Sequence, residues 1–260
     1  MRPTHVLICM MTGLSASFPI QPPLPSTVNS TNWTGYPTRT LANVTVIDTP
    51  LVRDALAFTR KHSSDEVWNH VMRGWLYGAL ILEDNDTLRA TVDPEVHALA
   101  AIMHDLGFDQ TPSSPIVSAD RRFEIDGAIA ARDFISHHGT QESWPERRMQ
   151  LVWDAIALHS QASIYAYKEP DVAAVGNGVS ADFTAPAVFG IPEQAYAAVL
   201  QEFPKVDLLG SVEQTFFWLC QTKPATTYDT FLQPWGERLV PGYSAVGHRG
   251  MDMILENLEQ

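Results

Sequence analysis

Basic side chains and cysteines are scarce in this 260-residue sequence, and each scarcity excludes a class of function. Lysine and arginine number 17 against 30 aspartate and glutamate, which gives a formal net charge of −13. Because nucleic acids and anionic membranes favour basic surfaces, neither is expected as a general partner. The two cysteines, Cys9 and Cys220, make neither a disulfide framework nor a thiolate zinc site. Any bound metal ion would therefore be held by nitrogen and oxygen.

Strand-forming and phosphate-binding patterns are also missing. The sequence has no alternating apolar run of any length, no internal repeat and no glycine-rich phosphate loop. Apolar residues make up 45% of the chain, ample for one sizeable core. Stretches at helical spacing recur to the end of the chain, where residues 192–203, 208–220 and 251–258 are expected to complete that core. The sequence therefore predicts an all-α protein with one main domain.

The start of the chain has the pattern of a leader. Residues 1–17 resemble a secretory signal peptide, with a basic start, a short apolar run and small residues. The apolar run is too short to span a membrane. Residues 18–31 are rich in proline, serine and threonine and predict a linker. Of seven asparagines, four stand in glycosylation sequons: Asn29, Asn32, Asn43 and Asn85. We therefore expect a secreted glycoprotein; a cytoplasmic protein with a disordered leader is the alternative.

Residues 93–107 carry the main functional signal. Asp93 can cap the first free N–H groups of a helix, and Pro94 fits the first helical position. An apolar run follows, and it ends by presenting His104 and Asp105 side by side before a glycine stop. Burying an imidazole and a carboxylate without a partner is costly. A divalent metal ion is the simplest partner for both.

The wider order of chemistry-bearing residues resembles a known superfamily. His70 lies upstream on a predicted helix at 63–82, and Asp182 ends a small-residue stretch downstream. His, then His-Asp, then Asp resembles the ligand order of the HD superfamily of metal-dependent hydrolases. The sequence around these residues is similar to that of the cyanamide-hydratase-like HD proteins of fungi. The similarity lies in five ordered stretches: 67–73, 102–107, 122–128, 155–159 and 220–227. The resemblance implies an HD-domain helical bundle over residues 32–260.

The resemblance also implies a metal site. One divalent transition metal, zinc or iron, would be held by His70, His104, Asp105 and Asp182. Four ligands leave room for water, whose pKa the metal lowers toward neutrality. From the residues alone, His70 could instead be a core histidine bonded to a backbone carbonyl. An aspartate at a helix C-terminus is unfavourable for the helix dipole, which favours a functional role for Asp182.

Other residues are candidates for proton transfer and substrate contact. Asp105 or Glu124 could move the proton, although Glu124 is explained equally well as a carboxylate at the start of a helix over 123–138. His159 ends the apolar stripe of a predicted helix at 145–159, as His104 ends its own. The expected substrate-binding set is Arg73, Tyr77, Phe123 and His159.

This apparatus could hydrate a carbon–nitrogen triple bond or attack phosphorus. The closer resemblance implies the first, with cyanamide giving urea, and the wider superfamily implies the second. Phosphate recognition needs positive charge near the metal, for which Arg73, Arg121 and Arg122 are available. The aromatic residues around the motifs favour a small neutral substrate. We therefore expect a hydratase or hydrolase acting on a nitrile-type small molecule; the alternatives are an HD phosphohydrolase and a non-catalytic, metal-dependent ligand-binding domain. Self-association is left open.

Overall fold

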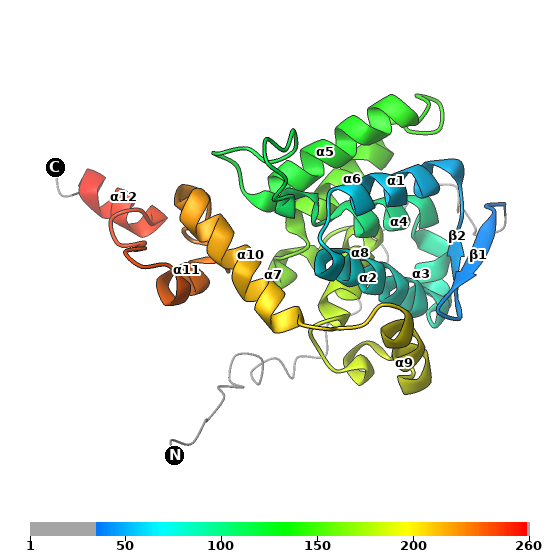
Figure 1. Ribbon diagram of the computed structural model, residues 1–260. Coiled ribbons are helices and arrows are strands. Elements are labelled where there is room, and N and C mark those ends of the chain that lie inside the picture. The colour runs from blue at the N-terminus through cyan, green and yellow to red at the C-terminus, as the bar shows by residue number, and fades with distance from the viewer. Residues whose placement is uncertain (1–34, 259–260) are drawn as a thin grey trace, which may run out of the picture.

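The computed structural model describes residues 35–258, and this part of the chain is a bundle of helices beside one small hairpin (Figure 1). Helices make up 64% of these residues. The all-α prediction is confirmed. The expected leader at 1–17, the expected linker at 18–31 and the sequons at Asn29 and Asn32 lie outside the described residues. Within residues 35–258, no helix combines the length and apolarity needed to cross a membrane.

Two short strands precede the helices. β1 (Thr38–Leu41) and β2 (Val44–Ile47) pair antiparallel, and Val44 and Val46 bury their side chains while Thr45 faces outward. The exposed turn between them holds Asn43 at a φ of +64°, a left-handed conformation that asparagine tolerates better than most residues. The sequence did not predict this hairpin, because strands of four residues are too short for alternation to stand out.

The main bundle consists of six helices with connecting pieces between and after them. The six are α1 (Pro50–Lys61), α2 (Asp65–Glu83), α4 (Pro94–Met103), α5 (Phe123–His138), α6 (Glu146–Leu158) and α8 (Pro170–Ala181). The connecting pieces are α3 (Asp86–Thr91), the 3-10 turn η1 (Leu106–Phe108), α7 (Ala162–Tyr165), η2 (Pro186–Phe189) and α9 (Glu193–Glu202). All ten residues of α4 are buried, so this helix forms the centre of the bundle.

The last fifth of the chain extends to one side of the bundle (Figure 1). It comprises α10 (Leu208–Thr222), η3 (Pro224–Thr226), α11 (Gln233–Leu239) and α12 (Gly250–Leu258). Leu219, Cys220 and Leu232 form a second, smaller apolar cluster with Phe123 of α5. The prediction that residues 251–258 complete the core is wrong, because α12 has no buried residue.

Helix starts follow the capping residues seen in the sequence. The Thr49 and Ser64 hydroxyls accept hydrogen bonds from Val52 N and Val67 N, and these contacts begin α1 and α2. At the start of α4, the Asp93 carboxylate accepts from two backbone N–H groups. The three helices therefore begin where side-chain capping satisfies their free donors.

Close approach between helices depends on glycine. A Cβ atom at Gly178 of α8 would lie 2.5 Å from the carbonyl oxygen of Gly74 and 2.9 Å from the backbone of Gly78, both on α2. A Cβ atom at Gly78 would in turn lie 2.3 Å from Nε2 of His97 on α4. Glycine therefore lets α2 pack tightly against both α4 and α8, and the chain segments that end these two helices meet beside α2.

Candidate metal centre

Three buried side chains bring their ligand atoms together where α2 passes the end of α4. Nε2 of His70 and Nε2 of His104 are 3.2 Å apart. Oδ2 of Asp105 lies 3.2 Å from Nε2 of His104 and 3.6 Å from Nε2 of His70. Each residue offers one atom to a group that could hold a metal ion. The structure therefore brings together His70 on α2 and the His104-Asp105 pair, the residues that the sequence singled out.

The end of α4 orients His104. This histidine is the C-cap of α4, and its Nδ1 donates to the carbonyl of Ala101 at 2.8 Å. The bond leaves the lone pair of Nε2 free to face the cluster. The chain then turns through Asp105 into η1, which swings the carboxylate beside the imidazole. A ligand pair that is adjacent in sequence thus presents two donors to one point.

The electrostatics of the cluster favour a cation. Burial alone would raise the pKa of the Asp105 carboxyl, but the imidazoles of His104, His70 and His159 outweigh it and lower this pKa to about 2. Burial also opposes protonation of His104, yet the Asp105 carboxylate raises the pKa of that imidazole. Two imidazole nitrogens and an ionised carboxylate therefore converge on a site that gains stability from positive charge.

The spacing of these atoms fits a transition metal. Ligands held about 2.0–2.1 Å from a tetrahedral zinc ion lie about 3.3–3.4 Å from one another. The three separations here are 3.2, 3.2 and 3.6 Å. Nitrogen and oxygen donors suit zinc or iron. His70, His104 and Asp105 therefore match such an ion in both chemistry and spacing.

Asp182 contacts the other nitrogen of the His70 ring. Its Oδ2 accepts a hydrogen bond from His70 Nδ1 at 2.7 Å, and Arg73 donates to both carboxylate oxygens at 2.7 and 2.8 Å. Lys205 Nζ lies 3.1 Å from Oδ1. These contacts hold the pKa of Asp182 well below its usual range despite burial. A carboxylate behind a ligating histidine fixes its tautomer and ring orientation. Direct ligation by Asp182, which the resemblance implied, stays a prediction.

His159 ends its helix as His104 does, and the two rings meet edge-on with centroids 4.8 Å apart. It is the C-cap of α6, its Nδ1 donates to the carbonyl of Ile156 at 2.7 Å, and its Nε2 lies 3.6 Å from Asp105 Oδ1. Burial, reinforced by the nearby His104, lowers the pKa of His159 to about 4. A neutral imidazole with a free Nε2 lone pair therefore faces the cluster; the substrate contact expected of His159 stays a prediction.

Glu124 lies beside the cluster without joining it. Its side chain is 1% exposed and accepts hydrogen bonds from Arg122 and from the Ser160 hydroxyl, the latter at 2.6 Å. Ser160 follows His159 directly, so Glu124 is linked to that histidine through the backbone. The proton-transfer role expected of Glu124 stays a prediction.

The expected substrate-binding residues divide into two groups. Arg73 is 1% exposed, and its Nη1 donates to the carbonyls of Phe203 and Pro204. Tyr77 is fully buried and stacks on Tyr196. Arg73 and Tyr77 therefore have no surface open to substrate, because the face of α2 that carries them packs against α8 and α9. Phe123 is 2% exposed but lies edge-on to His159, with ring centroids 5.7 Å apart.

Two nearby residues were missed from the sequence. The ring of Phe183 is 4.9 Å from that of His70 and half exposed, so it covers the outer side of the cluster. Phe183 directly follows Asp182 in the sequence, so its place near the site could have been predicted. Lys205, which pairs with Asp182, lies in a loop that shows no recognisable pattern.

Comparison with known proteins finds a similarity in the middle of the chain. Residues 67–179 match the family model described as the HD domain. No curated protein matches the chain. The matched segment is shorter than the 32–260 expected from the sequence; it contains all three clustered ligands and ends before Asp182. Members of this family are generally metal-dependent hydrolases. Residues 67–179 are therefore similar to the HD domain, and the buried cluster of His70, His104 and Asp105 within them is the candidate metal site.

Proposed function

We propose that this protein hydrates the carbon–nitrogen triple bond of a small neutral nitrile, with cyanamide as the first compound to test. The HD domain and the His-His-Asp cluster indicate metal-dependent hydrolase activity. Zinc or iron, when bound by His70, His104 and Asp105, supplies Lewis-acid chemistry and lowers the pKa of coordinated water toward neutrality. The resemblance to cyanamide-hydratase-like proteins supports hydration of a nitrile as the reaction.

The choice of a neutral substrate rests on one observation: the arginine side chains near the cluster are paired with carboxylates of this chain. Of the arginines available for phosphate, Arg73 is committed to Asp182. Arg121 and Arg122 lie 2.9 and 2.5 Å from the carboxylates of Asp126 and Glu124. A phosphomonoester needs positive charge that is free to face it. These pairings favour a neutral substrate over the phosphohydrolase alternative.

We assign proton transfer and the exclusion of bulk water to the residues around the cluster. Attack by water on the nitrile carbon forms a C–O bond and shifts a π-electron pair to nitrogen. Nε2 of His159 faces Asp105 with its lone pair free, so we assign it to take the proton that water loses and return it to that nitrogen. The resulting imidic acid tautomerises to the amide, which is urea when cyanamide is the substrate. Phe123 and Phe183 shield the histidines from bulk water.

A side-by-side assay of the zinc- or iron-loaded protein tests this proposal. We expect urea from cyanamide and no phosphate from a phosphomonoester panel. His159→Gln should lower kcat by roughly 10²–10⁴-fold while the metal content stays the same, because general acid–base help has this magnitude. His137→Gln, at an exposed histidine on α5, is the matched control. Turnover of phosphomonoesters alone would establish the phosphohydrolase alternative, and inactivity on both would favour the ligand-binding one.

A further inference from the structure

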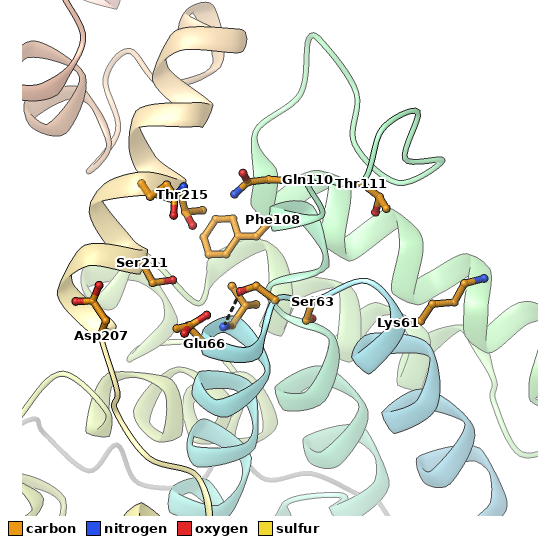
Figure 2. A pocket seen from close by; sticks show the side chains of 12 residues that line it. Lys61, Ser63, Glu66, Phe108, Gln110, Thr111, Asp207, Ser211 and Thr215 are labelled. Atoms are coloured by element: carbon orange, nitrogen blue, oxygen red, sulfur yellow. Dashed lines mark hydrogen bonds between the residues drawn. The ribbon is translucent and has the colours of Figure 1, made fainter.

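A cleft of about 420 Å³ opens between the start of α2, the end of α1, the chain after η1 and α10 (Figure 2). Figure 2 shows the Phe108 ring pointing into it. Hydroxyl and carboxamide groups line most of its wall, including Ser64, Gln110, Ser211, Gln214 and Thr215. The cleft is therefore a polar recess with one aromatic surface.

The cleft adjoins the metal site through two of its walls. Val67 lines it and stands three residues before His70 on α2, which is a rise of about 4.5 Å along the helix. On the other wall, Phe108 follows Asp105 by three residues and stacks on Phe123 with ring centroids 4.3 Å apart. Phe123 in turn meets His159 edge-on. None of the groups assigned to the reaction lines the cleft itself; His70 lies about one helical turn beyond Val67, and His159 lies behind the stacked rings of Phe108 and Phe123.

The charges around the cleft favour a neutral molecule over an anion. The carboxylates of Glu66 and Asp207 line it against one ammonium group, that of Lys61. The remaining polar groups are neutral donors and acceptors. One of them, Ser63 Oγ, is shielded from solvent and has no hydrogen-bond partner among residues 35–258. These features fit a neutral molecule with several hydroxyl or amide groups and one flat apolar face, which would rest on Phe108.

Cyanamide has three heavy atoms, whereas cavities of 300–1,000 Å³ typically hold drug-sized molecules. We propose that the cleft binds the non-reacting part of the substrate, so that the preferred substrate is a nitrile whose substituent is neutral, hydroxylated or amide-bearing, and flat on one side. This inference rests on the proposed nitrile hydration. Binding energy from such a substituent can be used to orient the nitrile at the metal.

Binding of an unreactive probe tests the cleft separately from the reaction. The probe is 3-hydroxy-3-phenylpropanamide, the product expected from the corresponding nitrile, titrated calorimetrically into the full-length zinc-loaded protein. Ser211→Trp on α10 and Gln110→Trp on the facing wall fill the cleft from opposite sides. We expect each to weaken binding at least tenfold. Leu209→Trp is the matched control, because Leu209 is on the same helix, is 65% exposed and does not line the cleft.

The outcomes separate the two proposals. Saturable binding that both filling variants weaken and the control retains, with unchanged melting temperatures, supports the cleft assignment. No saturable binding to the wild type overturns it, as does undiminished affinity in both filling variants. If the amide binds as expected but neither its nitrile nor cyanamide is turned over, the cleft stands and the nitrile reaction is refuted.

Discussion

Gly178→Ala should destabilise the protein and weaken its hold on metal, although alanine is the better helix former. The added Cβ would lie 2.5 Å from the carbonyl oxygen of Gly74 and 2.9 Å from the backbone of Gly78. Favourable carbon contacts begin near 3.5 Å, so α8 must move away from α2 by about 1 Å. Backbone atoms cannot rotate aside as a side chain end can.

The magnitude follows from two opposing contributions. Overpacking costs about 1–3 kcal/mol, and a clash with backbone belongs at the upper end. The gain in helix propensity is about 1 kcal/mol. The net loss is therefore about 2 kcal/mol, equivalent to a fall in melting temperature of about 4–8 °C for a chain of this size. The same displacement lengthens the 2.7 Å bond between His70 and Asp182, and losing such an outer contact typically costs about 10–100-fold in metal affinity.

Urea unfolding and a zinc titration against a competing chelator measure both effects. Gly74→Ala is the matched control in the same interface, because its Cβ would lie 3.5 Å from the nearest atom, at Val179, an ordinary contact. That variant should be unchanged or more stable by up to about 1 kcal/mol. A Gly178→Ala protein as stable as wild type, with unaltered zinc affinity, would refute the packing argument.

Four further outcomes are expected. His104→Ala should abolish stoichiometric zinc or iron binding in elemental analysis, because it removes a clustered donor. Lys223→Met should cost about 1–3 kcal/mol in urea unfolding, because it removes a buried partner of Asp126 at 2.8 Å while Arg121 still pairs with that carboxylate; adding Asp126→Asn should restore part of the loss. Burial lowers the pKa of His97 to about 4, so its contribution to stability is complete above pH 6.5 and is lost as the pH falls toward 4; His97→Gln should flatten unfolding free energy across that window. Asn43, exposed at the hairpin turn, should carry a glycan in mass spectra of protein from its native source if the chain is secreted.

Local sequence signals predicted the helix starts and the clustered ligands. Capping at Thr49, Ser64 and Asp93 acts within three residues, so it can be read directly from the chain. His104 and Asp105 were recognisable because they end a buried helix together. Such features depend on neighbouring residues alone, and the HD-domain match includes both ligands.

Contacts between distant segments were beyond such reasoning. Helical spacing puts Arg73, three residues after His70, on the same side of α2, but whether that side meets substrate or Asp182 depends on how α8 packs; Asp182 is 109 residues after Arg73. Tyr77 is covered by Tyr196, a residue of α9 that no local pattern relates to it. The cleft likewise requires α10 to lie across the start of α2, which apolar spacing in either helix does not specify.

The anchoring of the imidazoles has a consequence for how the metal enters. Each of the three histidines near Asp105 is fixed at Nδ1 by an acceptor from this chain: the carbonyls of Ala101 and Ile156, and the Asp182 carboxylate. Little side-chain entropy remains to be lost on binding, in contrast to zinc fingers, which are unfolded without their ion. The bundle also buries a large apolar core that needs no ion. Folding should therefore precede loading, so that the ion can be exchanged in the native protein without unfolding it.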